Sequence, residues 1–126
     1  MPTSLRTGVD IIEIDRFTSA FQRYNQRFLR RILTPIELAE NGENMASLAA
    51  RFAAKEAVAK AFGTGIGNIS WQDIEIRRGN SGEPILYLYG AAQKMAEEQN
   101  IASWSLSLSH THSHAIAIVV AMVEYV

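Results

Sequence analysis

The spacing of apolar and polar residues changes several times along the chain, and each change predicts a new element. Residues 5–14 (LRTGVDIIEI) alternate loosely and are rich in β-branched side chains, which is typical of a strand with Asp10 in its middle. From Asp15, which we take as an N-cap, apolar residues recur at helical spacing. These residues are Phe17, Phe21, Tyr24, Phe28 and Ile32. The pattern predicts a helix directly after the strand.

Two further helices are predicted in the middle of the chain. Thr34, Pro35 and Glu37 form a capping-box pattern that begins a short helix, which ends at Asn41 and Gly42. An alanine-rich stretch over residues 45–62 is the longest helical segment. Its apolar stripe consists of Leu48, Phe52, Ala59 and Phe62, and Gly63 is the natural stop.

The C-terminal half predicts four strands and one helix. Residues 73–77 and 85–89 form a hairpin, 90–99 a helix, and 104–109 and 115–123 two strands joined through 110–114. With 126 residues the chain is too short for two units that each have a sound core. We therefore expect an α+β fold over residues 1–126, a single domain with helices packed on one side of a mainly antiparallel sheet.

Composition narrows the class of protein. Hydrophobic residues make up 48% of the chain and charged residues 20%, as in ordinary globular domains. The absence of cysteine excludes a thiolate metal site and is compatible with the cytoplasm. No apolar signal segment opens the chain, and the longest apolar run, 115–123, is too short to span a bilayer. With a net charge of −1, we expect a cytoplasmic protein that binds neither membrane nor nucleic acid.

Although the net charge is close to zero, one segment of the chain is strongly basic. Five arginines and no acidic residue lie between Arg16 and Ile36, so the rest of the chain carries −6. They are Arg16, Arg23, Arg27, Arg30 and Arg31. If the helix is continuous, the first four lie on one face. Solubility is the ordinary explanation of surface charge, but like charges three and four residues apart repel. The pattern favours a docking face for an acidic partner.

Two carboxylates could form a metal site. Asp10 lies among apolar strand residues, where an unpaired ion is costly. Glu56 lies near the apolar stripe of the long helix, and Lys60 follows one turn later. Two oxygen ligands beside a cation suit Mg²⁺ and a phosphate ester. The alternatives are a simple Glu56–Lys60 pair on the helix surface and an edge-strand Asp10 in solvent.

Two other motifs are weaker. The loop from Gly63 to Gly67 could bring backbone N–H groups to a phosphate, but it follows a helix and lacks the ending of a P-loop, so a plain C-cap and turn is the alternative. The run Ser109–His114 has three alternating histidines, yet no further histidine or cysteine could complete a metal site. A Ser–His pair could also indicate a hydrolase, but this run lacks the glycine pattern of a nucleophile elbow. A polar hairpin loop is the simplest interpretation, with His110 as a phosphate or ribose contact the lesser one.

Taken together, four motifs resemble the holo-acyl-carrier-protein synthases, the small 4′-phosphopantetheinyl transferases. In chain order they are Gly8-x-Asp10 followed by Arg16; Phe28-x-x-Arg31-x-Leu33-Thr34-x-x-Glu37; Arg51-Phe52-Ala53-Ala54-Lys55-Glu56-Ala57-x-x-Lys60-Ala61-Phe62-Gly63-Thr64-Gly65; and Ser107-Leu108-Ser109-His110. The similarity runs from about residue 7 to residue 120. Arg6 departs from the glycine of many members, and members vary at the position of His110.

The resemblance implies a function and a set of site residues. Phosphopantetheine would pass from coenzyme A to a serine of apo-acyl carrier protein, as in fatty acid biosynthesis, with adenosine 3′,5′-bisphosphate released. The implied catalytic residues are Asp10, Glu56 and Lys60, and Asp10 and Glu56 would bind Mg²⁺. Coenzyme A would contact Arg51, Lys60, Gly63, Gly65 and His110. The carrier would dock on Arg16, Arg23 and Arg27, and the protein would be a homotrimer with sites at subunit boundaries.

Two other functions remain open from the residues alone. One is a non-enzymatic module whose basic helix docks an acidic partner, with purely structural carboxylates. The other is a metal-dependent phosphohydrolase acting on a nucleotide.

Overall fold

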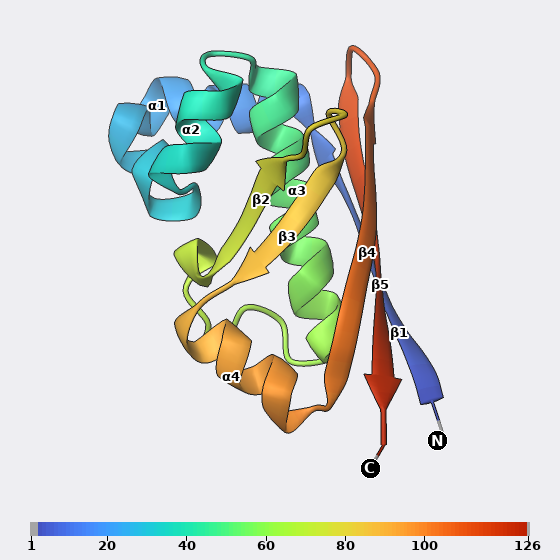
Figure 1. Cartoon of the computed structure of the whole chain (residues 1–126). Coiled ribbons are helices and arrows are strands. Elements are labelled where there is room, and N and C mark those ends of the chain that lie inside the picture. The colour runs from blue at the N-terminus through green and yellow to red at the C-terminus, as the bar shows by residue number, and fades with distance from the viewer. Residues whose placement is uncertain (1–2, 126) are drawn as a thin grey trace.

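The computed structural model describes residues 3–125, which form four α-helices, one short 3₁₀ helix and five strands (Figure 1). In chain order they are β1 (Thr3–Glu13), α1 (Ile14–Ile32), α2 (Pro35–Asn41), α3 (Met45–Phe62), η1 (Trp71–Asp73), β2 (Ile74–Arg78), β3 (Pro84–Leu88), α4 (Gly90–Glu98), β4 (Ile101–His110) and β5 (His114–Glu124). No helix among these residues is long and apolar enough to cross a membrane.

The strands form two antiparallel sheets. One has the order β1-β5-β4, with Asp10 opposite Ala117, and the other is the β2-β3 hairpin. Helix α3 lies between them, against one face of the three-stranded sheet, and α1, α2 and α4 are on the same side of that sheet (Figure 1). The α+β class is confirmed, and the antiparallel strands are divided between two sheets.

Helix α3 is buried on nearly all sides, whereas its apolar stripe predicted burial of one face only. Leu48 and Phe62 are buried as expected, but most of the helix's alanines are buried as well. Alanine adds little volume, so strands and helices can approach α3 closely all round. The alanine-rich composition therefore indicates a central helix rather than a half-exposed one. Gly63 ends it in a left-handed conformation with φ 84°, as expected.

Helix α1 differs from the prediction at two points. Its N-cap is Glu13 and not Asp15, because β1 continues to Glu13 and the Ile14 N–H donates to Ser113 O at 2.9 Å. The helix is also interrupted at Asn25, whose φ of 58° and ψ of −146° are not helical. The condition for a single arginine face, a continuous helix, is therefore not met.

A buried ion pair joins α2 to the central helix. Glu37 and Lys55 are both fully buried, and Lys55 Nζ lies 2.7 Å from Glu37 Oε1. Glu37 also accepts from the backbone of Thr34, which confirms the capping box, and from Ile76 N at 2.8 Å. Lys55 donates further to Trp71 O at 3.0 Å. Burial raises the pKa of Glu37 and lowers that of Lys55, and their mutual attraction opposes both shifts.

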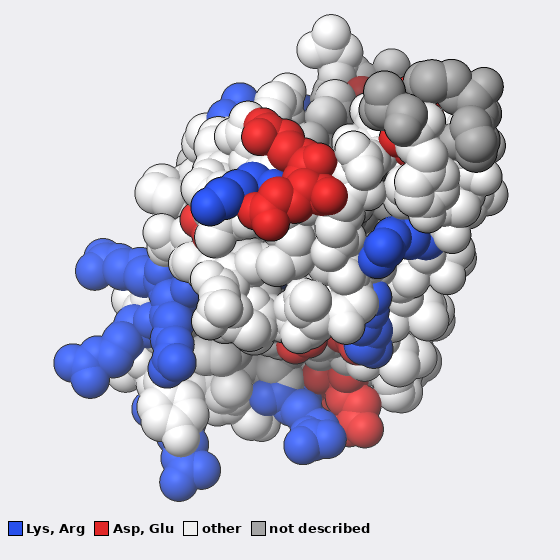
Figure 2. All heavy atoms as spheres, turned by 90° about the horizontal axis from the view of Figure 1, so that it is seen from below, with Lys and Arg blue, Asp and Glu red and all other residues white. Residues whose placement is uncertain are grey.

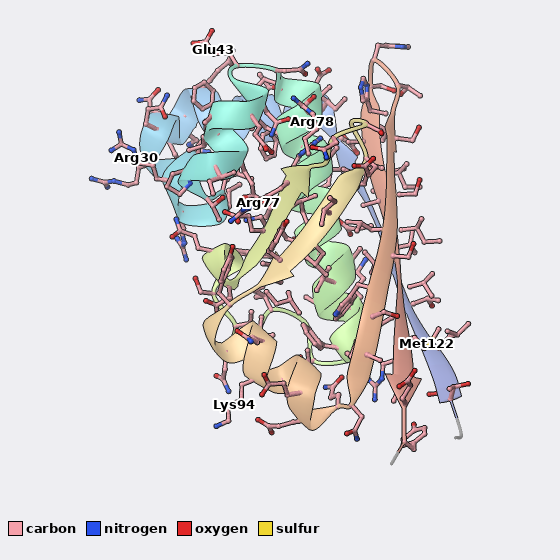
Figure 3. All side chains as sticks on the ribbon, viewed as in Figure 1. Arg30, Glu43, Arg77, Arg78, Lys94 and Met122 are labelled. Atoms are coloured by element: carbon pink, nitrogen blue, oxygen red, sulfur yellow. The ribbon has the colours of Figure 1, made fainter. Side chains whose placement is uncertain are left out.

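The outer face of the three-stranded sheet is apolar and exposed. The side chains alternate along β1 and β5, so those that do not contact α3 point away from the molecule (Figure 3). They are Leu5, Val9, Ile11, Ile116, Ile118 and Met122, with exposed fractions from 38% to 66%. No helix covers this face in Figure 1.

Candidate active site

The candidate site begins with the close approach of β1 to α3. A Cβ atom added to Gly8 would lie 1.9 Å from Ala57 O, which no side chain can tolerate. Only glycine allows the strand backbone to lie directly on the helix at this point. The next inward-facing residue on the strand is Asp10, so this contact brings Asp10 against the C-terminal half of α3.

Asp10 and Lys60 form an ion pair across this contact. Lys60 Nζ donates to Asp10 Oδ1 at 2.9 Å and to Val9 O at 2.9 Å. The Asp10 side chain is 17% exposed and that of Lys60 is 53% exposed. Although β1 is an edge strand, Asp10 is mostly buried and paired with Lys60. It is therefore not an edge-strand carboxylate in solvent, which was the alternative interpretation. Lys60 is available to a ligand from the solvent side.

Glu56 is the third member of this group. It is half-buried, one turn before Lys60 on α3, and no hydrogen bond or ion pair of its carboxylate occurs within residues 3–125. The expected Glu56–Lys60 pair does not form, because Lys60 reaches across to Asp10 instead. Burial raises the pKa of Glu56, the negative charge of Asp10 raises it further, and Lys60 offsets part of the shift.

Asp10 and the nearby Glu56, which repel each other electrostatically, are a chemically suitable donor set for a hard divalent cation. Mg²⁺ takes one or two carboxylates and completes its shell with water and substrate phosphates. In the described part of the chain no group of three or more His, Cys, Asp or Glu side chains gathers as a metal site. The residues fit a Mg²⁺ ion shared with a phosphate ligand better than a metal bound by protein alone.

A second region lies at the other end of α3. Arg51 and His110, both expected to contact coenzyme A, line one pocket of about 240 Å³ between α3, β4 and the β2-β3 turn. Arg51 is only 7% exposed, and its Nε has no hydrogen-bond partner. Burial lowers the pKa of Arg51 and the charge of Arg78 lowers it further, while Glu40 and Glu37 oppose the shift. An anion in this pocket would satisfy the buried guanidinium.

Arg78, which lines the same pocket, was not identified from the sequence. Helix α2 holds it in place: Arg78 Nη2 donates to Asn41 Oδ1 at 3.0 Å, and Nη1 donates to Glu40 O at 3.1 Å. Its backbone N–H also donates to Glu40 Oε1 at 2.9 Å. A basic residue just before the Gly79 turn was the available signal, but nothing local places it beside Arg51.

The glycine loop lies beyond the C-terminus of α3, close to Lys60. Gly63 caps the helix by donating to Lys60 O at 2.9 Å, and Gly65 has a φ of 66°. Both are exposed. Arg6 donates to Phe62 O at 3.3 Å, so the residue that departs from the family pattern supports the end of this helix. Gly63 is thus a C-cap, and its exposed loop is still available to a ligand.

The histidine run forms the β4–β5 turn. His114 Nδ1 lies 2.9 Å from Ser113 Oγ, whereas His110 Nδ1 lies 3.4 Å from Thr111 O. Ser109 and His110 make no hydrogen bond to each other in residues 3–125, so this pair lacks the geometry of a Ser–His nucleophile. The polar hairpin loop is the correct interpretation for most of the run, and His110 belongs to the Arg51 pocket.

The arginines of α1 form a basic surface that begins near the carboxylate group, where Arg16 lines one hollow together with Ile11 and Ile12. All five are exposed, and none takes part in an ion pair within the described residues. Figure 2 shows basic side chains gathered on the side of the molecule where α1 lies. Figure 3 shows Arg30 projecting away from the body. The structure thus brings Asp10, Glu56 and Lys60 together and places the arginines of α1 on an adjoining surface.

Known proteins share both the sequence and this fold. The model of the 4′-phosphopantetheinyl transferase superfamily matches residues 6–119. Holo-[acyl-carrier-protein] synthase of Herpetosiphon aurantiacus is 49% identical over 125 residues, covering 94% of this chain and 98% of that protein. The enzyme of the same name from Moorella thermoacetica is 48% identical over 106 residues, 82% of each chain.

Solved structures give the same relationship. Holo-[acyl-carrier-protein] synthase of Helicobacter pylori in complex with coenzyme A superposes with a TM-score of 0.85 at 36% identity, covering 91% of this chain and 98% of that one. The enzyme of Neisseria meningitidis has a TM-score of 0.85 at 42% identity, covering 92% and 96%. The chain belongs to the 4′-phosphopantetheinyl transferase superfamily, and within it to the holo-[acyl-carrier-protein] synthases. The expected enzyme class is therefore confirmed.

Proposed function

We propose that this protein transfers 4′-phosphopantetheine from coenzyme A to a serine hydroxyl of apo-acyl carrier protein. The products are the holo-carrier and adenosine 3′,5′-bisphosphate. The observation that carries the proposal is the meeting of Asp10 with Glu56 and Lys60, residues from two sequence motifs far apart in the chain, between β1 and α3. The near full-length similarity to enzymes of this name supports it.

The reaction breaks the phosphoanhydride bond of coenzyme A and forms a phosphodiester bond to the carrier serine, with adenosine 3′,5′-bisphosphate as the leaving group. The serine oxygen attacks the phosphorus that bears the pantetheine, and the bond from that phosphorus to the bridging oxygen breaks. Glu56 takes the serine proton, directly or through a water, from its position one turn before Lys60 on α3. Lys60, half exposed and already oriented by Asp10, balances charge on the leaving phosphate.

Asp10 and Glu56 would hold Mg²⁺. When bound, the ion supplies charge neutralisation and polarisation of the pyrophosphate. The Asp10–Lys60 hydrogen bond orients the first carboxylate, and Glu56 provides the second oxygen donor.

We assign the remaining contacts of coenzyme A to the two ends of α3. Arg51, Arg78 and His110 would bind a phosphate-bearing part of the molecule. Lys60, Gly63 and Gly65 would contact it near the reacting bond. Gly63 lies twelve positions after Arg51, about 18 Å along the helix axis, so an extended ligand is needed to reach both ends.

The basic surface of α1 would dock the carrier. Arg16, Arg23 and Arg27 are exposed and not paired with acidic groups in the described residues, so they complement an acidic helix of the carrier. Docking there would fix the position of the serine relative to the carboxylates, and positioning is a large part of such catalysis.

We further propose a homotrimer in the cytoplasm, with sites at subunit boundaries. The apolar outer face of the β1-β5-β4 sheet supports assembly, because contiguous exposed apolar side chains favour a protein partner. A second copy of the chain is the partner that the family resemblance implies.

One assay separates the proposal from its alternatives. Labelled coenzyme A, apo-carrier and Mg²⁺ are incubated with the protein, and label is measured in the carrier. We expect incorporation that requires the enzyme, the carrier serine and the divalent ion. Phosphate release without carrier would indicate a nucleotide phosphohydrolase, and carrier binding without incorporation would indicate a docking module.

A further inference from the structure

The interruption of α1 at Asn25 is unusual in its backbone geometry. A φ of 58° with a ψ of −146° lies near a region that residues other than glycine scarcely visit. Asn25 is exposed, and its side chain makes no hydrogen bond in the part of the chain described. Hydrogen bonds of the Asn25 side chain therefore do not hold this conformation, and what the residue contributes is its tolerance of a positive φ.

The packing shows how sharp the bend is. Residues 11 positions apart in a straight helix are separated by about 16.5 Å along the axis. Phe17 and Phe28 are 11 positions apart, yet their ring centroids lie 5.4 Å apart in an edge-to-face arrangement. The second half of α1 therefore folds back on the first, and its Leu29 and Ile32 join Phe17 in one buried cluster.

The bend also shapes the basic surface. One hollow of about 360 Å³ is lined by the first half of α1, including Arg16, Arg23 and the carboxylate of Asp15. A second hollow of about 360 Å³ is lined by Arg27 and Arg31 from the second half. The hollows adjoin because Tyr24, immediately before Asn25, lines both of them. A continuous helix would carry the second group of arginines away from the first.

We propose that the bend at Asn25 positions the two halves of α1 as one concave docking surface, which makes Asn25 a positioning residue for recognition of the acidic carrier. The inference rests on the proposed carrier docking at Arg16, Arg23 and Arg27. Asparagine is among the few side-chain-bearing residues that adopt positive φ with any frequency. Glycine adopts it freely, whereas alanine and glutamine favour continuation of the helix.

The test compares Asn25→Ala and Asn25→Gln with Asn25→Gly in steady-state kinetics against both substrates. None of the three changes alters charge, so a change in carrier KM cannot come from lost long-range attraction. We expect Ala and Gln to raise the carrier KM about fivefold or more, with kcat and the coenzyme A KM nearly unchanged, as for loss of docking contacts alone. Asn25→Gly should retain the wild-type carrier KM.

Other outcomes overturn the proposal. If Asn25→Ala or Asn25→Gln kept the wild-type carrier KM, the bend would not matter for docking. Should one of the two variants fail to fold, the other is sufficient for the test. An equal rise in Asn25→Gly would mean that the side chain matters and not the backbone. Arg23→Glu and Arg27→Glu, measured in parallel, separate the two claims. If they raise the carrier KM and the Asn25 variants do not, only the bend is rejected; if they do not raise it, the docking surface is rejected too.

Discussion

Glu56 is a carboxylate in a position where folding does not favour a negative charge. It is partly removed from water, and Asp10 lies close enough to repel it electrostatically. Lys60, which could have compensated, is bonded to Asp10 instead. Such an arrangement costs stability and is typical of a residue kept for binding or catalysis.

This cost predicts a pH-dependent stability difference. The pKa of Glu56 is 4.5 in the unfolded chain and higher in the folded protein. Between these two pKa values the folded protein binds more protons than the unfolded chain, so the free energy of unfolding falls as pH rises through this range. Without divalent ions, Glu56→Gln should therefore have a slightly higher Tm than wild type at neutral pH. The difference should shrink towards pH 4.5.

Thermal unfolding at several pH values checks this prediction. Glu98→Gln on α4 makes the same chemical change at an exposed position and should show no such trend. A lower Tm for Glu56→Gln at neutral pH, or a difference that does not vary with pH, would contradict the account of Glu56.

Among the elements, α3 holds the site in place and the Glu37–Lys55 pair fixes α3. Lys55 immediately precedes Glu56 but points about 100° away from it around the helix, towards α2 and η1, and its partner Glu37 also bonds β2. The pair thus sets the rotation of the helix that presents Glu56 and Lys60. It also holds the hairpin that carries Arg78 into the second pocket.

Breaking this pair should destabilise the fold severely. Glu37→Gln leaves the Lys55 charge buried without its partner, and removing one member of a buried pair costs about 3–5 kcal/mol. Chemical denaturation should show a loss of this size. The matched change Glu83→Gln, at an exposed position in the β2-β3 turn, should cost far less. Equal losses in the two variants would show that the buried pair contributes little.

For helix α1 we propose a different role, docking of the carrier, on the basis of its exposed arginines. Arg23→Glu should raise the carrier KM several-fold and leave the coenzyme A KM nearly unchanged, because these arginines act on encounter and docking. Surface attraction is screened over about 8 Å at physiological salt, so the wild-type carrier KM should rise with ionic strength and that of the variant should rise less.

Lys94→Glu is the control for this prediction. It makes the same reversal on α4, which is a different part of the surface from the α1 arginines (Figure 3). If Arg23→Glu and Lys94→Glu have the same effect on the carrier KM and on its salt dependence, the arginines of α1 only contribute to net charge.

At the scale of the whole molecule, the apolar outer face of the three-stranded sheet is not covered by any helix of the described residues. Met122→Lys places a charge in that face and should convert a trimer to smaller species, as measured by light scattering. Ile85→Lys is a matched control, since both residues are 38% exposed and Ile85 lies on the separate β2-β3 sheet. A wild type that is monomeric at working concentration would contradict the assembly.

Local signals in the sequence predicted local features correctly. The Thr34 capping box and the Gly63 helix stop depend on residues a few positions apart, and both formed as expected. The Asn25 bend, the buried Lys55 and the place of Arg78 depend on contacts between distant segments, which spacing cannot reveal. The resemblance to a known family supplied the pairing of distant carboxylates, for which residue spacing alone left alternatives open.

The most direct test of the central claim is the intact mass of apo-carrier after incubation with coenzyme A and Mg²⁺. With wild type, the mass should increase by one phosphopantetheine, matched one-to-one by adenosine 3′,5′-bisphosphate. Glu56→Gln should slow this conversion at least about 100-fold, because positioned proton transfer and charge neutralisation are lost together. Glu98→Gln should react like wild type. An unmodified carrier with wild-type protein, or near-normal conversion by Glu56→Gln, would contradict the account.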